Sequence, residues 1–397
     1  MKIVKIEDLH ANGGYSRHSF LKITTDEGIV GWSQYPDHGD ARAGVTGVIR
    51  GFAERLTGLD PREVGRISMT LHSSTFHAMG GLNHLAIAAI ENALLDIQGK
   101  ALGVPVYALF GGPFRRDIDL YWTHCGSFRV ARADFYEKEL GLPPIRTLDD
   151  LSCLAREAVE LGFKAVKTNP VILERGRLSM FNGGWRLEPG KLFTDRNPER
   201  AFINGIVEQL EAFRAGLGPD AGLMIDLAFN QRTEGFRRIA KALEPLDLTW
   251  LEIESKDPQS LAFIRSTTST PIASLETLYG QREFLPFFQN YAVDVAIIDA
   301  NYNGVWQAAR IAALADAHEL NVAPHNPLPG LASLQSAHFC ASIPNFRIME
   351  YRWDEAPWVA DFLTHPIIVE KGRLILSDRP GWGSDIDEAV LAAHPAI

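Results

Sequence analysis

From residue 117 onward, short apolar runs alternate with longer segments in which apolar positions recur with the helical period. The alternation is typical of βα units whose strands are parallel. Eight such units over about 235 residues match the usual size of a (β/α)8 barrel, which the sequence therefore predicts for residues 116–350. The apolar runs that would form its strands begin near residues 118, 163, 223, 250, 271, 294, 321 and 346.

The N-terminal residues, 1–115, follow a different pattern. Residues 1–37 alternate apolar and polar positions around a turn signal at Thr25-Asp26-Glu27-Gly28, which predicts antiparallel strands. Three segments with helical periodicity follow, and the clearest runs from Asn83 to Leu102 and ends at Gly103. Strands followed by helices predict an α+β unit.

The C-terminal tail, residues 351–397, contains two short apolar runs, 367–370 and 373–376, joined by Lys371-Gly372. They predict a hairpin that returns to the N-terminal sheet. The expected fold class is therefore α/β: a modified (β/α)8 TIM barrel with an α+β capping domain formed from the N-terminal segment and the C-terminal tail.

Two long inserts, 126–145 and 170–197, follow the first two barrel strands. Long inserts at the catalytic end of a barrel are usually binding loops or lids, but surface or subunit-contact loops are an equal alternative. A barrel mouth must also be closed against water. We therefore expect residues Gly13–Arg17 and Tyr35–Asp40 of the cap to overhang the site.

Composition narrows the classes of partner. The 397 residues have a net charge of −10 and a pI near 5.7, which argues against nucleic acid and acidic membranes as partners. The start of the chain lacks the apolar core of a signal peptide, and the three cysteines lack CxxC spacing. We expect a cytoplasmic protein with a small-molecule partner.

Acidic residues end the apolar runs. Asp226, Glu252 and Glu276 are 26 and 24 residues apart, about one strand-plus-helix unit each. Carboxylates at the same end of adjacent parallel strands make an oxygen-rich site for a hard divalent cation, which offsets their repulsion. The metal ligands predicted are these three, and Glu254 is placed in the loop after Glu252.

The next strand ends carry a candidate base. Asp299 ends one apolar run and His325 ends the following one, within reach across one strand spacing. A carboxylate paired with imidazole orients the ring and raises its basicity. Lys167 ends the second strand and could hold a substrate carboxylate or oxyanion, or pair with the acidic residues. Asn169 points to the same side as Lys167 because the strand period is two.

A second group of candidates could reach the barrel mouth or lie at the surface or in the core. It consists of His124 near the end of the first strand, with Tyr15, His18, His38 and His77 in the cap.

The pattern resembles the enolase superfamily, in particular the acid-sugar dehydratases of the galactonate type in its mandelate racemase-like branch. The resemblance covers essentially the whole chain. It rests on motifs that include Asp26–Trp32, Ala93–Lys100, Gly103–Gly112, Trp250-Leu251-Glu252, Pro324-His325-Asn326 and Met349-Glu350.

The resemblance implies a Mg²⁺ enzyme that removes the proton next to a carboxylate. It implies Asp226, Glu252 and Glu276 as metal ligands, Asp299 and His325 as a catalytic dyad, and Glu350 as an acid that touches the substrate carboxylate. The chain departs from many relatives at three places. Lys167-Thr168-Asn169 stands where many have Lys-x-Lys, which argues against racemisation by two bases. Ala228 stands where many have Asn, with Asn230 two residues on, and Gln34 stands where a glutamate is often found.

We therefore expect a Mg²⁺-dependent hydro-lyase that converts a sugar acid into a 2-keto-3-deoxy acid. The expected catalytic residues are His325, Asp299, Lys167 and Glu350, and Asn169, Asn230 and His124 are expected substrate contacts. The alternatives are a cycloisomerase or epimerase of a sugar-acid lactone and a metal-binding scaffold without turnover. We expect a homo-oligomer, from dimer to octamer.

Overall fold

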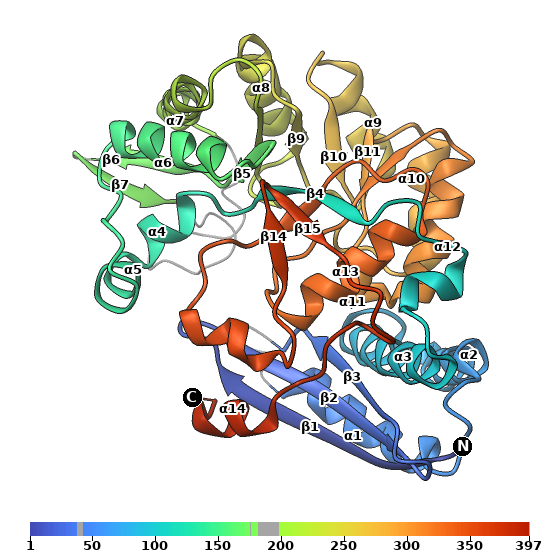
Figure 1. Ribbon diagram of the computed structural model, residues 1–397. Coiled ribbons are helices and arrows are strands. Elements are labelled where there is room, and N and C mark those ends of the chain that lie inside the picture. Colours follow the sequence, from blue (N-terminus) through green and yellow to red (C-terminus); the bar gives the residue numbers. More distant parts are fainter. Residues whose placement is uncertain (38–42, 175, 182–197, 397) are drawn as a thin grey trace.

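The computed structural model describes residues 1–37, 43–174, 176–181 and 198–396. Its centre is a ring of parallel strands in which sequence neighbours pair side by side (Figure 1). The last strand of the ring pairs with the first, and a bridge between Val322 and Phe346 joins it to the strand before it, which closes the barrel as predicted. The strands are β4 (Asp117–Trp122), β5 (Ala165–Thr168), β8 (Gly222–Asp226), β9 (Trp250–Glu252), β10 (Ile272–Ser274), β11 (Val295–Ile297), β12 (Asn321–Ala323) and β13 (Met349–Tyr351).

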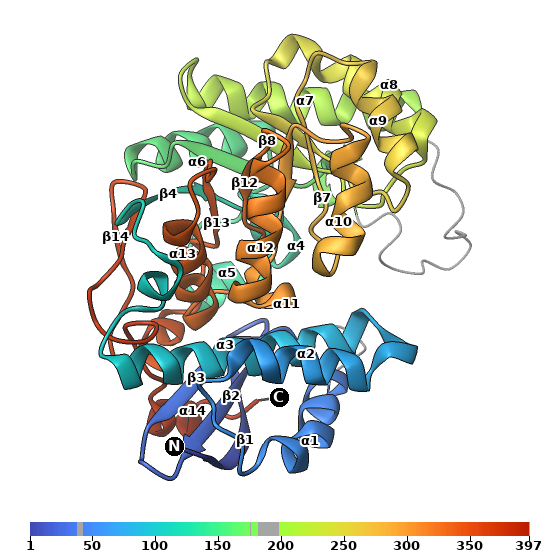
Figure 2. The same cartoon turned by 90° about the vertical axis from the view of Figure 1, so that its right-hand side faces the viewer.

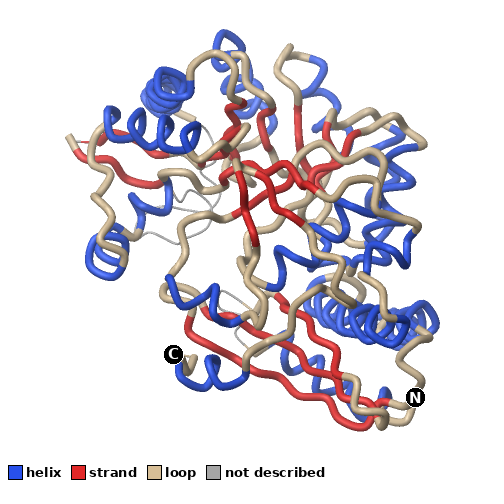
Figure 3. Tube along the Cα trace, viewed as in Figure 1, coloured by secondary structure: helices blue, strands red, loops and turns tan. Residues whose placement is uncertain are grey.

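Helices surround the strands, as Figure 3 shows. Local sequence fixes several of their starts: Thr147 and Asp150 form a reciprocal capping box on the first, and Asp257 caps another that has Pro258 in its first turn. The helices between successive barrel strands are α6 (Leu148–Glu160), α7 (Arg200–Leu217), α8 (Thr233–Leu243), α9 (Pro258–Ser266), α10 (Gly280–Gln289), α12 (Val305–Asp316) and α13 (Leu331–Ser342).

The cap is an antiparallel sheet packed against helices, and its longest helix lies between this sheet and the barrel (Figure 2). The C-terminal segment returns to the cap, where Trp358 Nε1 donates to the carbonyl of Asn12 (2.9 Å) and Ala11 forms a bridge with Pro395. The elements are β1 (Ile3–Asn12), β2 (Arg17–Thr25), β3 (Val30–Tyr35), α1 (Gly44–Leu56), α2 (Val64–Ser74), α3 (Gly81–Leu102), the 3-10 helix η5 (Pro357–Phe362) and α14 (Glu388–Ala393).

The C-terminal hairpin pairs with the barrel, not with the N-terminal sheet as predicted. Its strands are β14 (Ile368–Glu370) and β15 (Arg373–Ile375), and β15 runs antiparallel along residues 117–119 of β4. The closing strand β13 pairs only with residues 120–122 of β4. The hairpin therefore covers the half of the β4 edge that β13 leaves unpaired, and an open edge is a liability in any sheet.

The cap lies over the carboxyl ends of the barrel strands. Ser16 of the predicted loop accepts a hydrogen bond from Arg352, just after β13 (3.3 Å), and Tyr15 packs edge-on against Phe128, just after β4 (5.8 Å). The loop at residues 13–17 thus reaches the catalytic end. Residues 38–40 of the second predicted loop, including His38, lie outside the described part of the chain.

The two inserts differ in form. The first contains the short helices α4 (Ser127–Ala131) and α5 (Ala133–Glu139). The second begins with a small hairpin, β6 (Val171–Glu174) and β7 (Arg177–Met180), and its residues 182–197 are outside the described part.

Candidate active site

The strand period of two decides which side chains reach the barrel mouth. Side chains from alternate positions fill the barrel interior, including Met224 of β8 and Trp250 of β9. Successive residues of a strand point to opposite sides, so the residue two positions further on points the same way, at the carboxyl end. Six predicted site residues follow an interior residue in this manner: Lys167, Asp226, Glu252, Asp299, His325 and Glu350.

Glu276 lies one residue out of this register. The cause is Leu275, whose φ of 97° is in the left-handed region that such a residue rarely adopts. Its backbone N–H donates to Glu254 Oε1 (2.8 Å), and the hydroxyls of Ser274 and Thr277 donate to the same carboxylate (3.0 and 2.9 Å). Glu254 therefore anchors the turn that presents Glu276.

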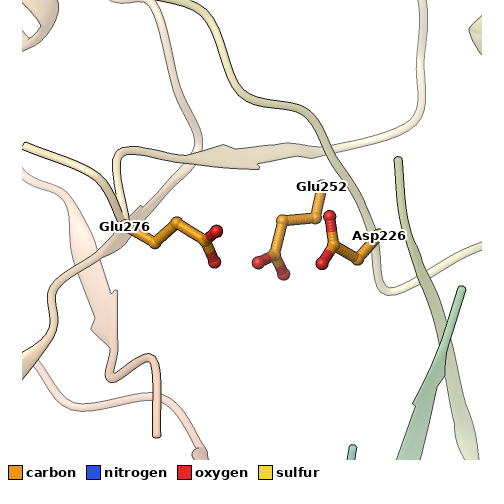
Figure 4. Close-up of side chains that lie close together, drawn as sticks. All are labelled: Asp226, Glu252 and Glu276. Carbon is orange, nitrogen blue, oxygen red and sulfur yellow. The ribbon is translucent and has the colours of Figure 1, made fainter. Parts of the chain in front are cut away.

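Three carboxylates point toward one another at the mouth (Figure 4). Asp226, Glu252 and Glu276 each offer an oxygen, and these oxygens lie within 4.8 Å of one another. Burial raises the pKa of all three, that of Glu252 to about 6, and the neighbouring carboxylates add to the effect. A buried all-oxygen set of like charges fits a hard divalent cation such as Mg²⁺.

Lys167 places a positive charge between Glu252 and Glu350. Its Nζ donates to both oxygens of Glu252 (3.0 Å each) and lies 3.3 Å from Glu350 Oε1. Burial opposes its charge, but Glu252 and Glu350 outweigh burial and raise the pKa of Lys167 well above its usual value. Lys167 is therefore charged and can only donate, as an electrostatic role requires.

Asp299 and His325 form a hydrogen-bonded pair. Asp299 Oδ2 lies 2.6 Å from His325 Nδ1, while Oδ1 accepts the backbone N–H groups of Asn301 and Tyr302 at the start of α11 (Ala300–Asn303). These bonds leave Nε2 as the outward nitrogen, 3.5 Å from Glu276 Oε2. Burial disfavours the charged ring, but Glu276 and Asp299 outweigh it and raise the pKa of His325 to about 10.

Glu350 is fully enclosed beside Lys167. Its oxygens accept hydrogen bonds from the hydroxyl of Thr123 and the backbone N–H of Asn326 (2.8 Å). Burial would raise its pKa, yet the charges of Lys167 and His325 hold it near 2. In this arrangement Glu350 is an ionised carboxylate that positions Lys167.

The predicted substrate contacts fall into two groups. Asn169 and His124 are bonded to each other, Asn169 Oδ1 to His124 Nδ1 (2.7 Å), so Asn169 is turned toward a protein partner. Asn230 is 5% exposed, and its Oδ1 has no hydrogen-bond partner among the described residues. It follows Ala228, which has φ of 44°, so the chain turns sharply after Asp226.

The candidates in the cap are scattered. His18 is buried against Phe362 and Gln34, His77 is exposed in a short 3-10 helix, and Tyr15 packs at the barrel mouth as described. Gln34 Oε1 accepts the N–H of Ala332 at the start of α13, a structural bond between cap and barrel.

Sequence reasoning missed Tyr302. Its ring meets His325 edge-on at 5.4 Å, and burial together with Asp299 and Glu276 raises the pKa of its hydroxyl well above the usual value. It is therefore a neutral donor beside the dyad. Its position three residues after Asp299, one helical turn on, is the signal that could have found it.

Among the helices of the described residues, none has the length and apolar character of a membrane-spanning segment.

Two known protein families match most of the chain. Residues 12–111 match the N-terminal domain of the mandelate racemase/muconate lactonizing enzyme family, and residues 150–390 match the enolase C-terminal domain-like family. A D-galactonate dehydratase family member from Streptomyces bingchenggensis is 30% identical over 94% of this chain and 89% of its own length. The expected assignment to the hydro-lyases of the enolase superfamily is confirmed at this level.

Two solved structures are informative. One, from Burkholderia xenovorans, is named as a candidate L-alanine-DL-glutamate epimerase bound to magnesium and fumarate; it is 42% identical, with a TM-score of 0.94 over 99% of this chain and 96% of that one. The other is the 3,6-anhydro-D-galactonate cycloisomerase from Zobellia galactanivorans, 25% identical, with a TM-score of 0.81 over the full length of both. The chain therefore belongs to the mandelate racemase/muconate lactonizing enzyme family of the enolase superfamily.

Proposed function

We propose that this chain is a Mg²⁺-dependent dehydratase of a sugar acid, an aldonate or aldarate, which it converts into a 2-keto-3-deoxy acid. The observation that carries the proposal is the convergence of two groups in one mouth. The carboxylates of Asp226, Glu252 and Glu276 lie together, and His325 Nε2 stands 3.5 Å from Glu276 at their side. The name of the dehydratase relative supports a sugar acid as the substrate class.

A proton next to a carboxylate is very weakly acidic, so its removal requires stabilisation of the charge that develops. Asp226, Glu252 and Glu276 would hold Mg²⁺, which would supply positive charge to offset the acid cluster, favour neutral His325 and stabilise the developing negative charge on the substrate carboxylate. Lys167 adds a fixed ammonium on the opposite wall, and Glu350 holds it there.

His325 is the candidate base. Its Nε2 accepts the proton from the carbon next to the carboxylate, while Asp299 accepts the hydrogen bond from Nδ1–H and stabilises the imidazolium. The same imidazolium can return this proton to the 3-hydroxyl as the C–O bond breaks, so water leaves and the enol becomes the 2-keto acid. One residue then serves as base and acid on one face, a syn elimination.

The test begins with a library of acid sugars, assayed for 2-keto acid formation with and without Mg²⁺. On the substrate found, His325→Asn should abolish dehydration and also exchange of the α-proton with deuterated solvent. Lys167→Met should lower the rate by roughly 100-fold, the usual loss for one charge-stabilising donor. His365→Asn, at an exposed position, is the matched control and should leave both rates unchanged.

The same experiment separates the alternatives. Solvent exchange of the α-proton without 2-keto acid would indicate the epimerase or cycloisomerase reaction, for which the two structural relatives are named. Neither exchange nor product with any acid would indicate a scaffold. If the His325→Asn protein exchanged the proton at the wild-type rate, His325 would not be the base.

A further inference from the structure

His124 stands at the end of β4 in a conformation that few residues adopt. Its φ is 51°, in the left-handed region, which residues other than glycine rarely adopt. The ring lies flat on Phe128, with ring centres 3.9 Å apart and planes within 9°. The backbone and the stacking together fix the direction of the imidazole.

The neighbours of His124 also fix its tautomer. Nδ1 lies 2.7 Å from Asn169 Oδ1, and because an amide oxygen cannot donate, Nδ1 carries the hydrogen. The amide is oriented from both sides: the Ser127 hydroxyl lies 3.0 Å from Oδ1, and Nδ2 donates to the carbonyl of Asp226 (3.5 Å). Burial lowers the pKa of His124 to about 3, so the ring is neutral.

Nε2 is therefore a hydrogen-bond acceptor, and it makes no hydrogen bond to the described residues. The charges of Glu350 and Lys167 both act on the pKa of the ring, so His124 lies on the same wall as these two residues. The side chain of His124 is partly accessible. An accessible acceptor of fixed direction can take a hydrogen bond from a hydroxyl group of a bound ligand.

We propose that His124, held by Asn169 as an acceptor at Nε2, receives a hydrogen bond from the hydroxyl on the carbon next to the substrate carboxylate. The site then selects 2-hydroxy acids over acids that lack this hydroxyl. The inference rests on the proposed function, since it takes the substrate carboxylate to lie beside Lys167. It also gives a role to the Lys167-Thr168-Asn169 sequence: the strand supplies an amide that orients His124 in place of a second amine.

The test compares two small acids that differ only at this position, glycerate and 3-hydroxypropanoate. Binding is measured calorimetrically with Mg²⁺ in the His325→Asn background, where turnover is absent. We expect glycerate to bind up to about 10-fold more tightly, the range for one added hydrogen bond. His124→Phe, which keeps the stacking, and Asn169→Leu, which releases Nδ1, should each reduce the ratio to near one.

Asn169→Asp is the matched control, because a carboxylate oxygen still accepts from Nδ1, and it should keep the preference for glycerate. Thermal unfolding identifies any variant that fails to fold. If His124→Phe fails to fold, Asn169→Leu still tests the inference. Equal binding of the two acids before any change at His124, or an unchanged ratio in Asn169→Leu, would overturn the inference alone. Failure of both acids to bind with Mg²⁺ would overturn the proposed function together with it.

Discussion

Glu91 of α3 offers a sharp test of how the cap is joined to the barrel. Its side chain is fully enclosed, and its Oε1 accepts the backbone N–H groups of Trp306 (3.0 Å) and Gln307 (3.3 Å) in the first turn of α12. Ser68 lies 3.0 Å from the other oxygen. Burial outweighs these bonds and raises the pKa of Glu91 to about 8. A protonated carboxyl satisfies all three partners at neutral pH.

The sign of the pH dependence follows from this shift. Below about pH 4.5, Glu91 is protonated in the folded and the unfolded chain, so it contributes no pH dependence. Between about 4.5 and about 8 the unfolded chain releases the proton while the folded chain retains it, and stability falls as pH rises. At about 1.4 kcal/mol per pH unit, the loss reaches roughly 3–5 kcal/mol by pH 8 and then levels off.

Glu91→Gln should remove this dependence while it keeps the bonds. The amide oxygen can accept from α12, and the amide nitrogen can donate to Ser68. We expect the difference in unfolding free energy between Glu91→Gln and wild type, measured by urea titration from pH 4.5 to 8.5, to grow in favour of glutamine. Glu91→Leu, which leaves two N–H groups without an acceptor, is the contrasting variant and should be less stable at every pH. A difference between the glutamine variant and wild type that stays flat across this range would refute the assignment of a protonated Glu91.

Three further predictions concern the metal, the dyad and the barrel mouth. Mg²⁺ at 100 times its Kd should raise the unfolding free energy by about 2.7 kcal/mol, and Asp226→Asn with Glu252→Gln should lose this gain in titrations with and without chelator. Tyr302→Phe should lower kcat/KM by roughly 10-fold through loss of one neutral donor, with an unchanged unfolding midpoint; unaltered kcat/KM would mean that the hydroxyl does not meet the substrate. Arg129 makes two hydrogen bonds to Asp354 (2.8 and 2.9 Å), and Arg129→Met should lower the unfolding free energy by about 3–5 kcal/mol because it strands a buried carboxylate. A loss below 1 kcal/mol in the same urea titration would contradict that last reasoning.

The barrel and most of the residues at its mouth were predictable from the sequence, because a strand has a fixed period. An acid or a histidine at the end of an apolar run must point with the residue two before it, as Asp226 does with Met224 and His325 with Ala323. Glu276 was placed with the others by its spacing, but the left-handed Leu275 that brings it there depends on an acceptor from a separate loop, the carboxylate of Glu254.

Contacts between distant segments could not be read from such a pattern. The bond between Asn169 and His124 joins the ends of two strands whose relative height is set only when the barrel closes, so this bond was not predicted. The hairpin at 367–376 was expected from its local sequence, yet its partner depends on how far β13 extends along β4. The local sequence pattern predicts a hairpin, but the strand with which it pairs depends on which strand edge the assembled sheet leaves unpaired.

The pairing of β15 with β4 also bears on the order in which the molecule can be completed during synthesis. Arg373 bonds Asp119 across 254 residues of chain, so the first strand of the barrel is made long before the strand that covers its lower edge. Pairings over such separations form slowly, and an uncovered edge meanwhile offers a template to other chains. A nascent chain that stalls after β13 would have a closed barrel and a complete set of mouth residues, yet it would carry an exposed strand edge until the final hairpin is made.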